Sequence, residues 1–328
     1  MCLNTEGGYS CSCQSDYRED PDNRNSCRVA RGKVGLLYAG KTDINLLDLS
    51  TNTSTVLVSR VSADSLDFHW AEARIFWLDR AARVLFSASL ASLDRPQVVV
   101  ADIGGGEDLA VDWLHHNVIW TDSALQTISL SSLGTLLSSC QAEILSDLFP
   151  DGSSGVVDLV SSGIENPRSI AVYPPSGLMF WSDLGDVARI ERADLDGANR
   201  LAIVADYIVW PAALCVDTVQ TRIYWVDVRL NSLSSSSFDG TNYRTVTSQL
   251  SYLSHPVSLA MLEDWVYWAN WGLTNTTLSR YNKITGAGPH ILTTISMVRT
   301  EKSTMSHMSG ALSFLGIGRE LHRTEIFS

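Results

Sequence analysis

The feature that most limits the fold of this chain is a short aromatic pattern that recurs about every 43 residues. In each clear copy, a large apolar residue is followed by Trp, one further residue and then Asp or Asn. Five clear copies are Phe76–Asp79, Ile119–Asp122, Phe180–Asp183, Tyr224–Asp227 and Tyr267–Asn270. A weaker copy precedes them at Leu37–Gly40. Regular recurrence at this period predicts six equal structural units.

Each unit carries the patterns of β-strands. A short apolar alternation, such as Leu109–Asp112, comes about ten residues before each anchor and predicts a buried strand. A polar-alternating strand and a Gly-containing turn follow the anchor, as at Asp196–Arg200 and Asp239–Arg244. Four strands in about 43 residues are typical of one propeller blade. We therefore predict an all-β, six-bladed β-propeller.

The propeller is expected to cover residues 30–320. Residues 293–328 have little of the repeat pattern and form an atypical tail, in which residues 310–316 could supply a strand that closes the ring. A Ser/Gly-rich stretch at 135–163 is interpreted as a loop insertion, because it lengthens one interval between anchors.

The recurring Trp and Asp residues are interpreted as structural. We expect each aromatic ring to fill the space between neighbouring blades, and each carboxylate to accept hydrogen bonds that tie one blade to the next. The residues in this group are Trp77, Asp79, Trp120, Asp122, Trp181, Asp183, Trp225, Asp227, Trp268 and Asn270.

The N-terminal segment has a different character, because four of the six Cys residues lie within the first 27 positions. Dense cysteine predicts a disulfide module and an oxidising compartment. The sequons at Asn52 and Asn275 agree with that compartment. Cys140 and Cys215 stand alone, and we expect Cys215 to be a reduced thiol inside the fifth unit.

Residues 2–13, with Cys27, resemble the second half of a calcium-binding EGF-like module, which sets the first domain at residues 1–29. The resemblance implies a Cys13–Cys27 disulfide and leaves Cys2 and Cys11 without their native partners. It also implies that Asn4 is one ligand of an incomplete calcium site. We thus expect no cofactor in this fragment, although calcium belongs to the complete module.

The formal net charge of -12 argues against nucleic acid and anionic membranes as partners. No apolar stretch has the roughly 18 residues that a spanning helix needs, and no signal peptide is visible.

The repeats, most closely the stretch Leu109–Leu130, resemble the YWTD propellers of the LDL-receptor family, which includes LDL, VLDL and vitellogenin receptors. That resemblance implies the extracellular portion of an endocytic receptor, in which the propeller acts in ligand binding and acid-dependent ligand release. Its partners would be lipoprotein or vitellogenin, bound by the full receptor, and the receptor's own calcium-binding ligand modules. It would lie outside the plasma membrane and in endosomes.

The turns between second and third strands and the connections between blades are expected on one face, where propellers of this family meet partners. We predict a protein-binding face there, with the residues Leu184, Trp210, Arg229, Asn231, His255 and Trp271, alongside Arg80 and Asp186. By the same rule, His69, His115 and His116 fall on the opposite face and are interpreted as ordinary surface histidines.

By resemblance, Trp210 and His255 keep the residues that serve acid release in the family, each before Pro. The chain departs from the family pattern at Leu184, Asn231 and Ser251, where the family can have Trp, His and Lys.

An alternative function is direct binding of an extracellular protein without a pH switch, as in Wnt co-receptors or nidogen. Some six-bladed propellers are hydrolases, but the chain lacks the motifs of common hydrolases and metalloenzymes. We expect no enzyme activity.

Overall fold

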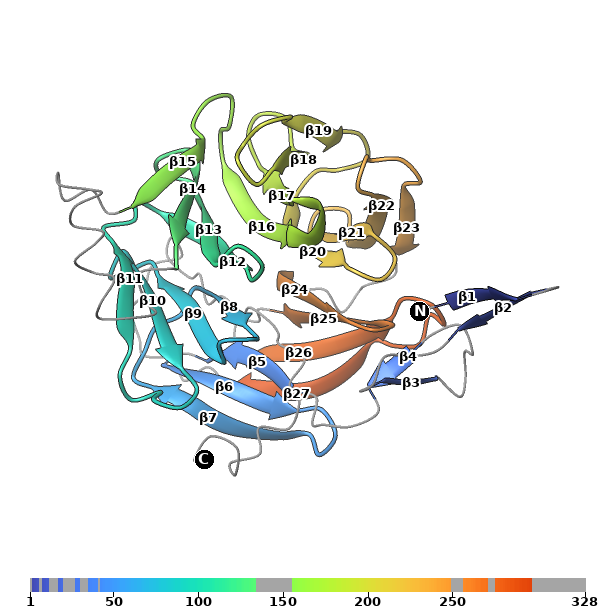
Figure 1. Ribbon diagram of the computed structural model, residues 1–328, viewed down its shortest axis with the longest axis horizontal. Helices are drawn as coiled ribbons and strands as arrows, with labels where there is room; N and C mark the ends of the chain where they lie inside the picture. The colour runs from blue at the N-terminus through green and yellow to red at the C-terminus, as the bar shows by residue number, and fades with distance from the viewer. Residues whose placement is uncertain are drawn as a thin grey trace.

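The computed structural model describes the backbone of residues 2–5, 8–11, 17–19, 27–29, 35–40, 42–133, 155–248, 256–270 and 275–296. Side chains are described from residue 35 onward, except at positions 257, 275, 276, 295 and 296. Nearly all regular structure in these ranges is antiparallel β-sheet. Figure 1 shows the larger sheets arranged radially around a common centre. The predicted all-β, six-bladed propeller is confirmed.

The blades follow one another along the chain. Blade one contains β5 (Gly35–Ala39), β6 (Asp43–Asp48) and β7 (Thr53–Ser59). Blade two contains β8 (Ser65–His69), β9 (Arg74–Asp79), β10 (Val84–Ser89) and β11 (Gln97–Ala101). Blade three contains β12 (Gly106–Asp112), β13 (Asn117–Asp122), β14 (Thr127–Ser132) and β15 (Val156–Val160).

The second half of the ring has the same plan. Blade four contains β16 (Pro167–Tyr173), a three-ten turn η2 (Pro174–Ser176), β17 (Leu178–Asp183), β18 (Arg189–Asp194) and β19 (Leu201–Val204). Blade five contains β20 (Pro211–Asp217), β21 (Arg222–Asp227), β22 (Ser232–Ser237) and β23 (Arg244–Thr247). Blade six contains β24 (Pro256–Leu262), β25 (Trp265–Asn270), β26 (Asn275–Asn282) and β27 (His290–Ser296).

The recurring aromatic pattern forms the second strand of blades two to six, as predicted, and its weaker first copy lies in β5 of blade one. Each Trp is buried against the preceding blade, so that Trp120 packs with Phe76 and Leu78 of blade two. Trp181 packs in the same way against Ile119 of blade three. Burial of these large rings contributes apolar contact that holds neighbouring blades together.

The ring is closed by side-chain packing between its first and last blades. Leu36 and Tyr38 of β5 lie in one apolar cluster with Tyr267 and Leu278 of blade six. The Asn52 amide Nδ2 also donates a hydrogen bond to the Leu292 carbonyl oxygen, at 2.8 Å. The predicted closing strand at residues 310–316 lies outside the described residues.

The first strands of blades two to five lie around the centre and are joined by a chain of polar contacts. The Ser65 hydroxyl donates to Asp108 at 2.6 Å, and the Ser169 hydroxyl donates to the same carboxylate at 2.8 Å. The Leu214 amide then donates to the Ser169 hydroxyl, at 3.1 Å. These contacts fix the register of the inner strands and therefore the positions of the turns at both ends.

The N-terminal segment contains two hairpins, β1 (Cys2–Thr5) with β2 (Gly8–Cys11) and β3 (Tyr17–Glu19) with β4 (Cys27–Val29). The expected Cys13–Cys27 disulfide and the Asn4 calcium ligand stay predictions, since Cys13 and these side chains lie outside the described residues. Cys215 is a buried free thiol in β20, as expected.

Candidate protein-binding face

At one end of each complete blade, the connection that enters the blade meets the turn between its second and third strands, as the strand order predicts. The first residue of an inner strand pairs with the last residue of the second strand, as Pro211 does with Asp227 in blade five. Pro167 pairs with Asp183 in the same way in blade four. The connection that enters a blade therefore lies beside the turn between its second and third strands.

In blade five, one buried carboxylate organises both of these loops. Asp227 Oδ2 accepts hydrogen bonds from the backbone amides of Val209 and Trp210, at 2.7 and 2.9 Å. Its Oδ1 accepts from the amides of Arg229 and Leu230, both at 3.0 Å. One side chain can hold both loops because the two oxygens of a carboxylate accept several hydrogen bonds at once. The expected role was to accept hydrogen bonds that tie one blade to the next; in blade five the acceptor holds the connection that enters the blade and the turn that follows.

Trp210 and Arg229, both predicted for this face, are brought together by these loops. The Arg229 guanidinium carbon lies 5.3 Å from the centre of the Trp210 ring, which is cation–π distance. The Trp210 residue remains 42% exposed. A large aromatic ring is therefore presented to solvent on a backbone that Pro211 and Asp227 hold in place.

The other predicted face residues are placed less favourably or lie outside the described residues. Leu184 is partly buried in the turn of blade four, while Asn231 is exposed with a positive φ of 49° in the turn of blade five. His255 and Trp271 lie outside the described residues. Arg80 is held in an ion pair with Glu107, at 2.6 Å.

Sequence reasoning missed two apolar residues beside Trp210. Val209 and Leu230 are both more than two-fifths exposed, and each donates its amide to Asp227 as described above. They had no signal of their own, because single exposed apolar residues are common. Their position next to Trp210 follows only from the pairing of two loops through Asp227.

The opposite end of the ring also differs from expectation. His115 and His116 are partly exposed, as predicted, but the prediction that His69 is a surface histidine is wrong, because His69 is 0% exposed. His69 ends the first strand of blade two, where blades three and five have Asp112 and Asp217. Its Nδ1 accepts the Glu72 amide at 3.3 Å, which is the turn-capping role of those carboxylates.

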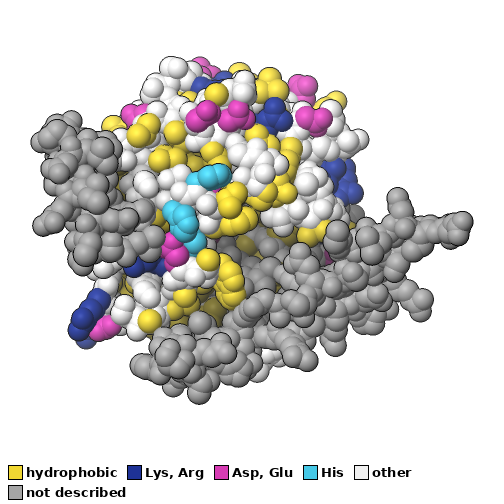
Figure 2. Space-filling model, in the orientation of Figure 1, with side chains coloured by type: hydrophobic (Ala, Val, Ile, Leu, Met, Phe, Trp, Pro, Cys, Tyr) yellow, Lys and Arg dark blue, Asp and Glu magenta, His cyan; other side chains and the backbone are white. Residues whose placement is uncertain are grey.

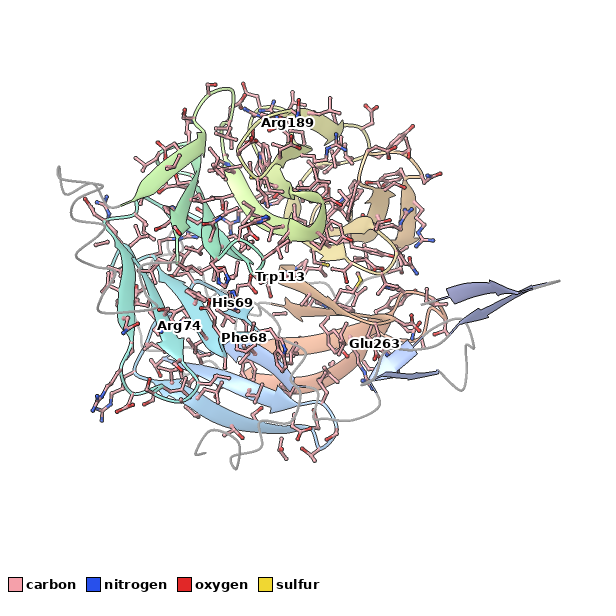
Figure 3. The ribbon with its side chains drawn as sticks, viewed as in Figure 1. Phe68, His69, Arg74, Trp113, Arg189 and Glu263 are labelled. Atoms are coloured by element: carbon pink, nitrogen blue, oxygen red, sulfur yellow. The ribbon has the colours of Figure 1, made fainter. Side chains whose placement is uncertain are left out.

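Exposed apolar side chains surround these histidines. Figure 2 shows histidine near the middle of this face with hydrophobic side chains around it. Trp70, Trp113 and Leu114, in the turns after β8 and β12, are each between 42% and 49% exposed. Figure 3 places His69 and Trp113 toward the middle of the ring.

Two carboxyl groups on the inner strands, those of Asp67 and Asp108, have raised pKa values. Burial raises the pKa of Asp67 to about 7, against the opposing effect of hydrogen bonds from the Val111 and Phe68 amides. Burial also raises the pKa of Asp108 from its ordinary value, and hydrogen bonds from Ser65, Ile170 and other groups oppose that shift.

The predicted glycosylation sites are placed in part. Asn52 is exposed at a turn in blade one, while the Asn275 side chain lies outside the described residues. In the described part of the chain, no helix is long and apolar enough to span a membrane.

Comparisons with known proteins agree with the repeat. Residues 177–218 and 221–261 match the family model described as low-density lipoprotein receptor repeat class B. The vitellogenin receptor Yl of Drosophila melanogaster is 32% identical over 287 residues, which are 82% of this chain and 13% of that receptor. The chain thus spans a small part of this relative's length.

Two solved structures show the same fold. A chain from a nidogen–laminin complex has a TM-score of 0.67 at 21% identity, covering 86% of this chain and 97% of that one. Regucalcin from Agrobacterium tumefaciens, described as a calcium-binding protein, has a TM-score of 0.53 at 16% identity, with 77% of each chain covered. At these identities the likeness shows the fold alone.

Proposed function

This chain belongs to the family of propellers built from low-density lipoprotein receptor class B repeats, and from that premise we propose that it is the ligand-binding propeller of a lipoprotein- or vitellogenin-type endocytic receptor. It would act on the extracellular side of the plasma membrane and in endosomes. The observation that carries this proposal is the exposed Trp210 ring with the Arg229 guanidinium over it.

Trp210 and Arg229 have the properties of a binding hot spot. Trp and Arg are the residue types that most often dominate protein interfaces, where a single one contributes about 2 kcal/mol or more. The Asp227 carboxylate already holds both loops, so little conformational entropy is lost when a partner binds. A preformed aromatic anchor of this kind supports protein binding without catalysis.

The partner class follows from charge. The chain has a net charge of -12, yet this face presents the permanent positive charge of Arg229. Calcium-loaded, cysteine-rich ligand modules of the same receptor carry carboxylates that would pair with it. We propose that His255 adds a second positive charge in endosomes, because an unperturbed His gains its proton near pH 6.5.

The acid effect is expected to be modest. Leu184 and Asn231 cannot titrate, so His255 alone would supply the added charge among the predicted face residues. One hydrogen bond to a charged group contributes about 1.5 to 3 kcal/mol at best. Solvent screening reduces that value at an exposed site.

The proposal is tested by measuring the affinity of isolated calcium-loaded ligand modules at about pH 5.5 and about pH 7.4. Trp210→Ala should weaken binding roughly thirtyfold at both pH values, in line with a hot-spot loss of about 2 kcal/mol. His255→Ala should remove the extra affinity at the lower pH and leave binding at the higher pH unchanged. Trp113→Ala is the matched control, since Trp113 is 47% exposed on the opposite face.

The outcomes separate two functions. Equal affinity at both pH values, with Trp210→Ala still damaging, would favour constitutive binding of an extracellular protein. That alternative is supported by the residues Leu184 and Asn231, which stand where the acid-release pattern can have Trp and His. If Trp113→Ala weakens binding and Trp210→Ala does not, the binding face is the opposite one and the proposal fails.

A further inference from the structure

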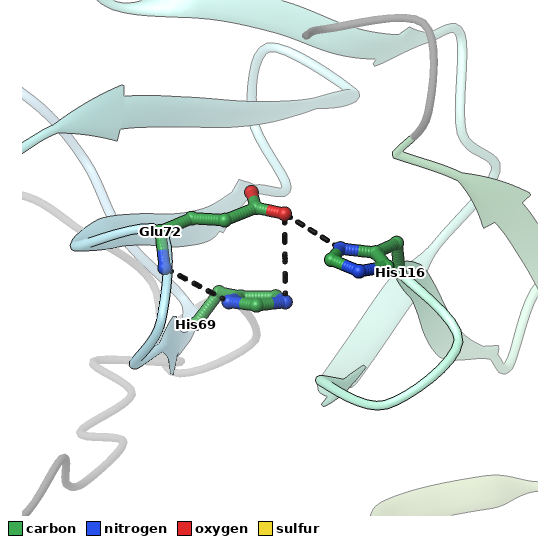
Figure 4. A group of neighbouring side chains, drawn as sticks. All are labelled: His69, Glu72 and His116. Atoms are coloured by element: carbon green, nitrogen blue, oxygen red, sulfur yellow. Dashed lines mark hydrogen bonds and ion pairs between the residues drawn. The ribbon is translucent and has the colours of Figure 1, made fainter.

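Three side chains from two neighbouring blades converge on the face opposite Trp210. His69 and Glu72 come from the end of β8 and the turn that follows it, and His116 comes from the turn between β12 and β13 (Figure 4). Each offers one potential ligand atom, and these atoms all lie within 4.8 Å of one another. His116 Nδ1 lies 2.6 Å from Glu72 Oε1, and His69 Nε2 lies 3.6 Å from the same oxygen.

The His69 ring is held rigidly in this position. The residue is 0% exposed, and its Nδ1 accepts the Glu72 backbone amide at 3.3 Å. The His69 and His116 rings are stacked, with centroids 5.2 Å apart and planes 16° from parallel. Both histidines thus direct a nitrogen toward one carboxylate oxygen.

His69 Nε2 has no hydrogen-bond partner among the protein atoms of the described structure, although it is buried. Its distance of 3.6 Å from Glu72 Oε1 is too long for a hydrogen bond. A buried polar atom without a partner costs about 1 to 3 kcal/mol. This nitrogen points into the space between a carboxylate and a second imidazole, where a bound cation would satisfy it.

We propose that His69 Nε2, Glu72 Oε1 and His116 Nδ1 form a binding site for a divalent transition-metal ion of the zinc class, which ties blade two to blade three. Two imidazole nitrogens and one carboxylate oxygen are the donor set that zinc, cobalt, nickel and copper prefer. Calcium and magnesium prefer a shell of oxygens, so this set discriminates against them.

The distances fit this ion with a small adjustment. In a tetrahedral zinc site with bonds near 2.1 Å, two ligand atoms lie about 3.4 Å apart. The 3.6 Å between His69 Nε2 and Glu72 Oε1 is close to that value. His116 Nδ1 must move away from Glu72 Oε1 by about 0.8 Å and must also approach His69 Nε2, which lies within 4.8 Å, and the half-exposed His116 side chain leaves room for this rotation. A fourth position remains for water.

Metal binding also requires proton shifts at both histidines: His116 moves its Nδ1 proton to Nε2, where solvent can accept it, and His69 changes tautomer. With the ion on Nε2, the ring proton resides on Nδ1, which no longer accepts the Glu72 amide. The backbone groups of His69 and Trp113 interact with the ring, and a small rotation of the ring would turn the Nδ1 proton away from the Glu72 amide. The weak 3.3 Å hydrogen bond from the Glu72 amide to His69 Nδ1 is lost, and His69 gains a bond from Nε2 to the metal and a hydrogen bond donated by Nδ1.

The test uses the full chain in chelator-treated buffer near pH 7.4, titrated with Co²⁺ and then Zn²⁺. Wild type should bind one Co²⁺, with the visible absorption of a nitrogen- and oxygen-ligated ion, and Zn²⁺ should displace it. Excess Ca²⁺ should not displace it. Because an ion that binds the native state stabilises it, Zn²⁺ should also raise the melting temperature.

Three variants assign the ligands. His116→Ala and Glu72→Gln should each weaken Co²⁺ affinity more than about tenfold, since even the loss of an outer-shell partner weakens metal sites by 10- to 100-fold. His115→Ala should change affinity less than about twofold, because His115 lies in the same turn but pairs with Asp112 at 2.8 Å. Neither exposed histidine is needed for the apolar core, so both variants should fold.

The proposal is overturned if wild type binds no Co²⁺, or if His115→Ala loses as much affinity as His116→Ala. An intense near-ultraviolet band from thiolate-to-cobalt charge transfer would place the ion on cysteine instead and would also overturn it. Loss of binding in both His116→Ala and Glu72→Gln, with His115→Ala unaffected, would support the assigned ligands.

Discussion

The carboxyl group of Asp108, in the inner strand of blade three, contacts the inner strands of the two neighbouring blades. Its Oδ1 accepts the Ser65 hydroxyl of β8, and its Oδ2 accepts the Ser169 hydroxyl and the Ile170 amide of β16. Burial nevertheless raises its pKa, so the folded chain holds a proton there more readily than the unfolded chain does. The cost of desolvating the charge exceeds the benefit of these hydrogen bonds.

This shift predicts the direction of a pH effect on stability. A carboxyl whose folded pKa is raised contributes stability that is complete below its unfolded value of 3.8 and is lost as pH rises through the folded pKa. Asp108 should therefore make the propeller less stable as pH rises above 3.8 and through the raised pKa. Melting temperatures of wild type and Asp108→Asn across this range test the effect, and the variant should show the smaller decline.

Asp108→Asn should also be less stable at every pH, because an amide cannot accept bonds at both of its terminal atoms. Only the slope of melting temperature against pH therefore reports on the titration of Asp108. Asp239→Asn is the control, since hydrogen bonds from Thr241 lower the pKa of Asp239 and place its titration below this range. Parallel pH profiles for wild type and Asp108→Asn would contradict the prediction.

Among the elements, the end of the second strand determines how loops are presented. In blade three the Asp122 carboxylate accepts the Gly105 amide from the entering connection and the Leu125 amide from the following turn. In blade five, Asp227 accepts amides on both sides in the same way. In blades three and five, one acid thus holds two separate loops.

Asp227→Asn should lower the free energy of unfolding by roughly 3 kcal/mol, because the new amide group would face buried N–H donors that then lose their acceptor. Urea denaturation measures this change. Affinity for ligand modules should fall as well, since the Trp210 loop loses its anchor.

Asp79→Asn is the matched control for that experiment. Asp79 occupies the same repeat position in blade two but is partly exposed, and it accepts the Ala82 amide within its own turn. Its substitution should cost less than about 1 kcal/mol. Equal losses in the two variants would mean that the joint anchoring of two loops adds nothing to stability.

For the whole molecule, the junction between blades one and six is the point where the ends of the ring meet. β5 is buried along its full length, yet among the described strands it pairs with β6 alone. Buried backbone groups are almost always hydrogen-bonded. A further strand is therefore expected at the inner edge of β5.

Residues 310–316 remain our candidate for that strand, and truncation tests them. A chain that ends at residue 309 should melt roughly 5 °C or more below the full chain, because the β5 edge would lose its partner. A chain that ends at residue 316 keeps the candidate strand and should melt with the full chain. Identical melting of both truncated chains would exclude this segment as the closing strand.

The sequence by itself determined the architecture of this protein. A large aromatic residue at a fixed period, as at Trp120 and Trp181, must be buried once per unit, and alternating strands can bury it only between stacked sheets. The recurring Asp residues accept hydrogen bonds as expected of carboxylates, but their partners differ between blades, as Asp79 and Asp227 show. The number and spacing of the recurring Trp and Asp residues can be read directly from the sequence.

Only the tertiary structure decided the surroundings of particular side chains. His69 looked like a turn histidine, but the neighbouring blade covers it and brings His116 to the same carboxylate. The contact between Trp210 and Arg229, and the packing of Leu36 against Tyr267, likewise join residues that no local pattern relates. Burial and charge pairing depend on what lies across a blade junction, and that is set by the closure of the whole ring.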